Sequence, residues 1–203
     1  MTCEALDLEV TESLKNVFIA SQNSRNDVKT FYVHQQSTKY FPNNVGFLFP
    51  DLVYVFNELS QLKFIEKKHF MNMDKVVELS LARNAIESIP ADAFDHLRNV
   101  EIIYLHINRL KQLSANLFIK NSNLREIFVY RNQLETLPNG LFRNNHGIVG
   151  LHFDHNKLRK IGIHFDPSRS YERINFNGNV CTNIIFPDNS GQTELILEIQ
   201  KNC

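Results

Sequence analysis

Apolar residues recur along this chain with a period of 24 residues. The segments that start at residues 76, 100, 124 and 148 read VVELSLARNAI, VEIIYLHINRL, LREIFVYRNQL and IVGLHFDHNKL, and all four fit the pattern LxxLxLxxNxL with other aliphatic residues in some leucine positions. A fifth segment, YERINFNGNVC (171–181), places Asn179 one residue early and has Cys181 in the last apolar position. Such a repeat predicts a solenoid, in which each unit buries its apolar face against the next.

The same register extends towards the amino terminus in a less regular form. One step back from residue 76, Ser60 stands in the asparagine position and Asn57 in an apolar one, while the other apolar positions hold Leu52, Val55, Leu62 and Ile65. Two steps back, Gln36 and Thr38 replace the asparagine and the final leucine, while the apolar positions hold Val28, Phe31, Val33 and Phe41. We therefore predict seven repeats over residues 28–180, a partial N-terminal cap over 1–27 and a C-terminal cap over 181–203.

The spacing inside each repeat predicts a short strand. In LxxLxL the last two apolar residues alternate with outward residues, which is the periodicity of a strand with one buried face. Stacked repeats place these strands parallel to one another. The asparagine that follows carries two donors and an acceptor, so it can satisfy backbone groups where the chain turns out of the strand.

The 16 phenylalanines of the chain follow the same period, and there is no tryptophan. Phe70, Phe94, Phe118 and Phe142 each lie ten residues after the asparagine position, while Phe47 and Phe165 miss that position by one residue. Stacked repeats would bring these rings together as a spine behind the strands. Each buried ring is worth roughly 2 to 3 kcal/mol of apolar burial.

These motifs resemble the leucine-rich repeat family, specifically its 24-residue extracellular type, whose consensus continues as LxxLPxxxFxxL. Ile89-Pro90 with Phe94 and Leu137-Pro138 with Phe142 fit that continuation. The resemblance implies an α/β solenoid shaped as a horseshoe, with a parallel β-sheet on the concave face and little regular helix on the convex side. It also implies a structural asparagine ladder, formed by Asn84, Asn108, Asn132, Asn156 and Asn179.

Charge and hydropathy exclude several classes of partner. The chain has 22 basic and 22 acidic residues, so it has no net field to attract nucleic acid unless the basic residues gather in a local patch. The longest strongly apolar stretch, residues 45–56, has twelve residues and includes Pro50 and Asp51, which is too short for a membrane helix of roughly 20 residues. We therefore expect no nucleic-acid partner and no transmembrane segment.

The three cysteines bear on the compartment. A disulfide between Cys181 and Cys203 would tie the end of the chain to the last repeat and add roughly 3 kcal/mol of stability, whereas two buried free thiols are the alternative. The end of the last repeat resembles the cysteine-bearing caps of secreted arthropod leucine-rich repeat proteins, which implies an oxidising compartment. Cys3 would then belong to an N-terminal cap whose other cysteine is missing.

The residues MTCEALDLEV lack the features of a secretory signal, which taken literally indicates a cytosolic protein. The resemblance instead implies that a signal peptide is missing upstream.

Outward positions of the strands form two columns across the repeats. The middle column reads Tyr32, Phe56, Ser80, Tyr104, Phe128, His152 and Asn175, and the next column reads His34, Glu58, Ala82, His106, Tyr130, Asp154 and Asn177. Aromatic side chains on the face away from the core are available to a partner, although they also stabilise their cross-strand neighbours. The predicted partner-binding residues are Tyr32, Phe56, Tyr104, His106, Phe128, Tyr130, His152 and Asp154, with the densest group at Tyr104, Phe128 and Tyr130.

No feature of the sequence indicates catalysis, a cofactor or a metal. The motifs GxSxG, HExxH, GxxxxGK[ST] and CxxC are absent. His152, Asp154 and His155 are ligand types for zinc, but a third convergent ligand would have to be His106, which lies two repeats or about 10 Å from Asp154. We therefore expect no enzyme activity, no cofactor and no metal site.

The sequence thus indicates a non-catalytic, extracellular recognition module that binds a protein on its concave face. Resemblance to secreted arthropod members of the family suggests roles in innate immunity, receptor-like signalling or adhesion. The alternative is an intracellular scaffold or adaptor for a cytosolic protein. Free thiols at Cys181 and Cys203 would favour that alternative, whereas a disulfide between them favours the extracellular module.

Overall fold

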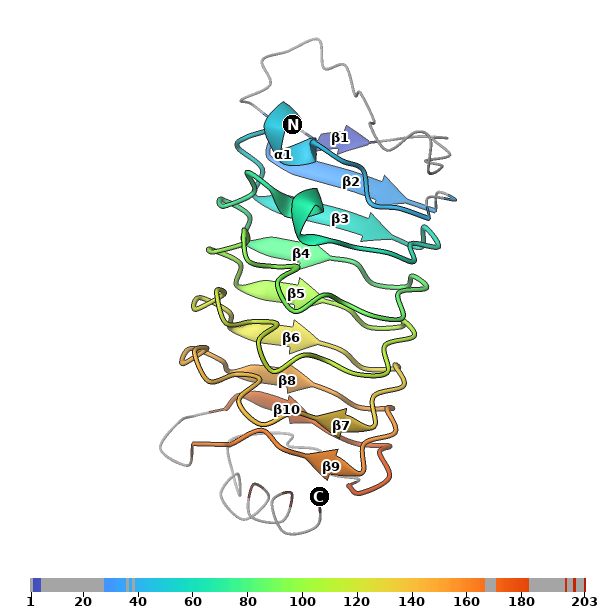
Figure 1. The fold of residues 1–203 in the computed structure, drawn as a ribbon, viewed down its shortest axis with the longest axis vertical. Helices are drawn as coiled ribbons and strands as arrows, with labels where there is room; N and C mark the ends of the chain where they lie inside the picture. The colour runs from blue at the N-terminus through green and yellow to red at the C-terminus, as the bar shows by residue number, and fades with distance from the viewer. Residues whose placement is uncertain are drawn as a thin grey trace.

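The described residues form a solenoid with a parallel sheet along one face (Figure 1). The computed structural model describes residues 2–4, 28–35, 37, 39–166, 171–182, 196, 199 and 203. Its main sheet has eight strands, which lie side by side in sequence order: β1 (Thr2–Glu4), β2 (Thr30–His34), β3 (Tyr54–Glu58), β4 (Glu78–Ser80), β5 (Ile102–Tyr104), β6 (Glu126–Phe128), β8 (Gly150–His152) and β10 (Arg173–Asn175). The strands β7 and β9 belong to a separate small sheet. The last seven are the strands of the seven predicted repeats, and β1 adds a strand from the predicted N-terminal cap.

Strand register follows the sequence period. Leu79 pairs with Ile103, Ile103 with Ile127, and Ile127 with Leu151, so each partner lies 24 residues further along the chain. These aliphatic side chains are buried, while the residues on either side of them point to the opposite face of the sheet. The alternation predicted from the sequence is therefore confirmed.

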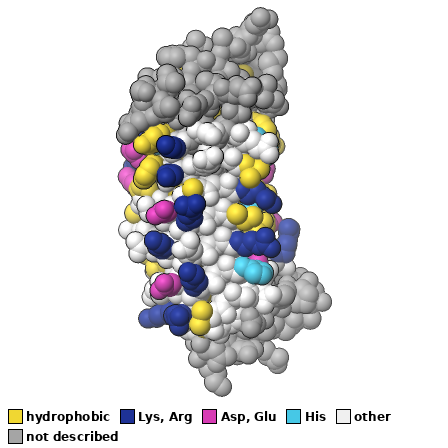
Figure 2. Space-filling view, turned by 90° about the vertical axis from the view of Figure 1, so that its right-hand side faces the viewer, with side chains coloured by type: hydrophobic (Ala, Val, Ile, Leu, Met, Phe, Trp, Pro, Cys, Tyr) yellow, Lys and Arg dark blue, Asp and Glu magenta, His cyan; other side chains and the backbone are white. Residues whose placement is uncertain are grey.

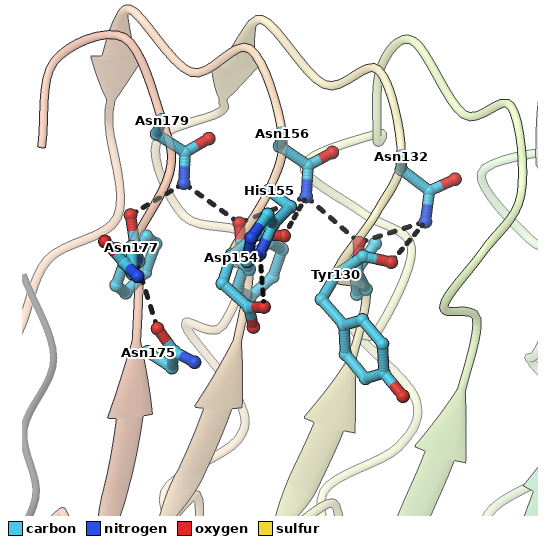
Figure 3. Close-up of polar contacts among 11 residues, drawn as sticks. Tyr130, Asn132, Asp154, His155, Asn156, Asn175, Asn177 and Asn179 are labelled. Carbon is cyan, nitrogen blue, oxygen red and sulfur yellow. Dashed lines mark hydrogen bonds and ion pairs between the residues drawn. The ribbon is translucent and has the colours of Figure 1, made fainter. Parts of the chain in front are cut away.

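A repeated turn follows the strands from β4 to β10, and asparagine stabilises it. The Oδ1 of Asn132 accepts a hydrogen bond from the Leu110 N–H at 3.0 Å, and its Nδ2 donates to the carbonyls of Leu105 and Val129 at 3.0 and 2.9 Å. Equivalent sets are made by Asn84, Asn108, Asn156 and Asn179, the last two of which Figure 3 shows beside Asn132. The asparagine ladder thus joins each turn to the one before it.

The phenylalanine spine is present at four of the predicted positions. Ring centroids are 5.7 Å apart for Phe70 and Phe94, 6.1 Å for Phe94 and Phe118, and 5.7 Å for Phe118 and Phe142. Phe41 continues the row at 5.2 Å from Phe70. These contacts account for much of the phenylalanine content of the chain.

Phe47 does not join the spine, so that part of the prediction is wrong. Its side chain is 60% exposed on the short helix α1 (Val45–Leu48). The residue in spine register is Gly46, where an added Cβ would lie 2.2 Å from the carbonyl oxygen of Met71. Close backbone packing therefore fills the space that a ring occupies in later repeats. Phe165, which also lies one residue from the spine register, is buried, and its ring centroid is 6.1 Å from that of Phe176.

A second row of buried asparagines lies on the side of the core away from the main sheet, and the sequence analysis missed it. Asn121 donates to the carbonyls of Phe94 and Leu97 at 2.9 and 2.8 Å. Asn145 donates to the carbonyls of Phe118 and Asn121 at 3.1 and 2.6 Å. Their spacing of 24 residues was visible in the sequence, but only the structure shows that both amides are buried.

The remaining elements are short. Outside the main sheet lie the 3-10 helix η3 (Lys67–Phe70) and a separate two-stranded sheet of β7 (Thr136–Leu137) and β9 (Lys160–Ile161). Cys181 and Cys203 form a disulfide, with their Cα atoms 5.3 Å apart. Gln36, Thr38 and most of both predicted caps lie outside the described residues. Within the described part of the chain, no helix has the length and apolar character that a membrane crossing requires.

Candidate functional site

The middle outward column lies as the sequence predicted. Strand pairing places its members opposite one another from β2 to β10, in the order Tyr32, Phe56, Ser80, Tyr104, Phe128, His152 and Asn175. The pairing follows from the constant repeat length, because adjacent parallel strands hydrogen-bond in register only when each turn uses the same number of residues. The concave face therefore presents one continuous column of side chains.

Five of the predicted residues form a stacked group that we call the aromatic ladder: Tyr104, His106, Phe128, Tyr130 and His152. Tyr104 stacks on Phe128 with centroids 4.7 Å apart, and Phe128 stacks on His152 at 4.2 Å. Beside them, His106 stacks on Tyr130 at 4.4 Å. All five side chains are half-buried, so part of each ring faces solvent. The stacked pairs also stabilise the sheet, by about 0.5 to 1.5 kcal/mol each.

Tyr32 and Phe56 form a separate group near the amino end. Their rings meet edge to face, with centroids 6.2 Å apart. Strand β4 separates them from the aromatic ladder with Ser80, which is 1% exposed, and Ala82, which is 0% exposed. At β4 the two columns therefore keep their outward register, but their side chains are not exposed. Small side chains there are covered by larger neighbours, such as Glu58, which accepts a hydrogen bond from the Ser80 hydroxyl.

Acidic side chains from a third column, which the sequence analysis did not consider, line the aromatic ladder. Glu126 lies 3.2 Å from the Arg173 guanidinium and 3.8 Å from the Nε2 of His152. Gly150 makes room for it, because an added Cβ there would lie 2.8 Å from the Glu126 Cγ. Glu78 lies on the other side of the aromatic ladder, near the Tyr104 hydroxyl. This column lies two residues before the middle one, so the strand alternation already pointed to it.

Burial controls the protonation of the aromatic ladder. Desolvation, reinforced by the neighbouring Glu78 carboxylate, raises the pKa of Tyr104 to about 12, so the phenol remains a donor at neutral pH. Desolvation also lowers the pKa of His106 and of His152 below the usual 6.5, although the carboxylates of Glu58 and Glu126 oppose that shift. Both imidazoles are therefore neutral at pH 7 and present aromatic rather than cationic surface.

Asp154, the last predicted site residue, lies beside the turn after β8. Its carboxylate is 2.9 Å from the Nδ1 of His155, as Figure 3 shows. Among the described residues, no group of three or more histidine, cysteine, aspartate or glutamate side chains is placed to hold a metal ion. The pair is thus a local polar contact at the carboxyl end of the aromatic ladder.

A parallel sheet with one short strand per turn, buried aliphatic residues behind it and an asparagine ladder at each turn define a leucine-rich repeat solenoid. The family model for the leucine rich repeat matches residues 58–110 and 98–158. The chain belongs to the leucine-rich repeat family.

Several solved structures share this fold. The Toll–Spatzle complex, a molecular hub in Drosophila development and innate immunity, matches 76% of this chain with 25% identity and a TM-score of 0.68. The leucine-rich repeat domain of APL1 matches 88% with 18% identity and a TM-score of 0.76, and the LRIM1/APL1C complex matches 88% with 19% identity and a TM-score of 0.73. This chain covers 21%, 48% and 32% of those three chains. No curated protein matches the sequence.

Proposed function

We propose that this chain is a non-catalytic, extracellular recognition module that binds a protein partner on its concave face, through the aromatic ladder. The supporting observation is the stacked, half-buried group of Tyr104, Phe128 and His152 on the face opposite the core. Stacking and partial burial restrict the rotation of these rings before any partner arrives, which lowers the side-chain entropy lost on binding. Aromatic side chains of this kind are enriched among residues that dominate protein interfaces.

Two observations support the setting of this proposal. The disulfide between Cys181 and Cys203 fits an oxidising, extracellular compartment. The Toll–Spatzle complex, which matches three quarters of this chain, is an assembly of proteins in development and innate immunity. Recognition in innate immunity, receptor-like signalling or adhesion is therefore the class of role that we propose.

Site-specific photo-crosslinking tests the location of the partner. A photoreactive phenylalanine analogue replaces Phe128 in the aromatic ladder, and the matched control carries it at Phe64, which is 53% exposed outside the concave face. Both proteins are incubated with the extracellular fluid of the source organism and then irradiated. We expect position 128 to capture one protein that position 64 does not capture.

A second variant connects this capture to the aromatic ladder itself. Tyr104→Ser and Tyr130→Ser, added to the protein labelled at position 128, should abolish the crosslink while circular dichroism shows an intact fold. Equal capture from positions 64 and 128, or capture that persists in the double serine variant, would show that the partner does not use the aromatic ladder.

A further inference from the structure

On the side of the solenoid where the strands end, Lys39 and Lys63 are exposed near the amino end, and seven further exposed basic side chains gather beyond them. We call these seven the basic edge. Figure 2 views the molecule from that side and shows the dark-blue side chains of lysine and arginine along its length. The members are Arg83, Arg109, Lys111, Arg131, Lys157, Arg159 and Lys160. They come from four consecutive repeats, so the group is a property of the assembled solenoid.

Backbone hydrogen bonds between turns order the basic edge into columns. The N–H of Arg83 donates to the His106 carbonyl at 2.9 Å, and the N–H of Arg131 donates to the Asp154 carbonyl at 3.0 Å, which places both arginines in the turn position directly before the asparagine ladder. The N–H of Arg109 donates to the Ile86 carbonyl of the preceding turn at 2.9 Å and starts a second column. Since neighbouring turns are about 4.8 Å apart, the charges extend over roughly 15 Å along the solenoid axis.

The basic edge lacks compensating charge. Within the described residues, none of its seven side chains makes an ion pair or a side-chain hydrogen bond, and the acidic residues interspersed with them are Glu87 and Glu135. Asp154, which lies next to this side, already contacts His155.

Several basic residues elsewhere are compensated, although Arg98, Lys120 and Arg125 make no ion pair with a described residue. Lys29 and Lys75 both pair with Asp51, and Lys67 pairs with Asp92 and Asp95. The overall charge of the chain is zero, so the clustering of unpaired basic residues at the basic edge is a local feature. Clustered like charges repel one another, and a bound polyanion would relieve that repulsion.

We propose that the basic edge binds an extended sulfated polysaccharide lying along the solenoid axis. Charges in columns over several turns match a linear polyanion, and arginine offers paired donors to the oxygens of each anionic group. The nearest aromatic side chains, His106 and Tyr130, already stack on each other at 4.4 Å, which leaves little stacking surface for the bases of a single-stranded nucleic acid. This surface lies beside the aromatic ladder and does not depend on the protein partner proposed for it.

Binding to a fluorescent heparin fragment at several NaCl concentrations tests the proposal. The edge variant carries Arg109→Gln, Lys111→Gln and Arg131→Gln. The control variant carries Arg98→Gln, Lys120→Gln and Arg125→Gln, which are exposed, make no ion pair with a described residue and lie in the segments that lead into β5 and β6. Both variants lose three positive charges, and circular dichroism checks that both fold.

We expect the full chain to bind heparin, and the edge variant to bind at least about tenfold more weakly near 0.15 M salt. The slope of log affinity against log salt should fall by about one for each charge removed. The control variant should bind within about twofold of the unmodified chain. An equal loss in both variants, an equal affinity for desulfated heparin, or tighter binding to a single-stranded RNA oligomer than to heparin would overturn the proposal.

Discussion

Asn132, at the centre of the asparagine ladder, provides the sharpest test of how the solenoid is held together. Its side chain is 7% exposed and joins four backbone groups, as an acceptor from Leu110 and a donor to Leu105, to Val129 and, at 3.5 Å, to Tyr130. Asn132→Ala removes all four hydrogen bonds, of which the one to Tyr130 is long and leaves a carbonyl that still accepts from the Ile107 N–H. The carbonyl of Leu105 also accepts from Asn108, and that of Val129 from Asn156, so each carbonyl keeps one partner.

The expected cost follows from this sharing. The Leu110 N–H loses the acceptor that the ladder provides, and a buried donor without a partner costs about 1 to 3 kcal/mol. The two carbonyls lose one of two donors each, which adds about 0.5 kcal/mol per bond, at the low end of the usual range. Asn132→Ala should therefore lower the free energy of unfolding by about 2 to 4 kcal/mol.

Urea denaturation with the disulfide intact measures this free energy, and Asn123→Ala is the matched control. Asn123 is exposed and donates to the Oδ1 of Asn99 at 3.2 Å, so its loss should change stability by less than about 0.5 kcal/mol. Hydrogen exchange should show faster exchange at the Leu110 amide and little change at the Ile86 amide, which Asn108 protects. If Asn132→Ala costs no more than the control, the ladder does not stabilise the fold as we have argued.

Two further predictions concern the core and the aromatic ladder. Phe118 is fully buried between Phe94 and Phe142, so Phe118→Ala should destabilise the chain by about 3 to 5 kcal/mol in urea denaturation, and a loss below about 1 kcal/mol would contradict the packed spine. Burial lowers the pKa of His152 in the folded state, so the unfolded chain binds more protons as the pH falls through about 6.5. Stability should therefore decrease from pH 7.5 to 5.5, and His152→Gln should make that decrease smaller; an unchanged or steeper decrease would show that His152 is not shielded.

The sequence predicted the sheet and the asparagine ladder well because both depend on the repeat length. Hydrogen bonds between turns join residues about 24 positions apart, so a constant period determines which residues meet, as for Ile103 and Ile127. The prediction failed where a repeat departs from this regularity. At Phe47 the chain forms α1, and the backbone near Met71 fills the space that a ring occupies in other repeats.

The sequence predicted which residues of the candidate site face outward, but not how their side chains divide into separate groups. Strand alternation identified Tyr104, Phe128 and His152 as outward residues, and their register is confirmed. Their separation from Tyr32 and Phe56 depends on the size of the side chains at β4 and on the neighbours that cover them. Partner binding at these residues stays a prediction until it is measured.

By itself, the sequence determined the path of the backbone: a parallel strand, a turn closed by asparagine and a buried ring in each regular repeat. Only the tertiary structure decided how side chains on neighbouring turns combine. Glu126 reaches Arg173 across the space left by Gly150, and cations from four turns gather without partners at the basic edge. The physical reason is the distance along the chain between interacting residues. The pattern of apolar residues can be read within one repeat, whereas lateral contacts and local charge depend on side chains that only folding brings within a few ångströms of one another.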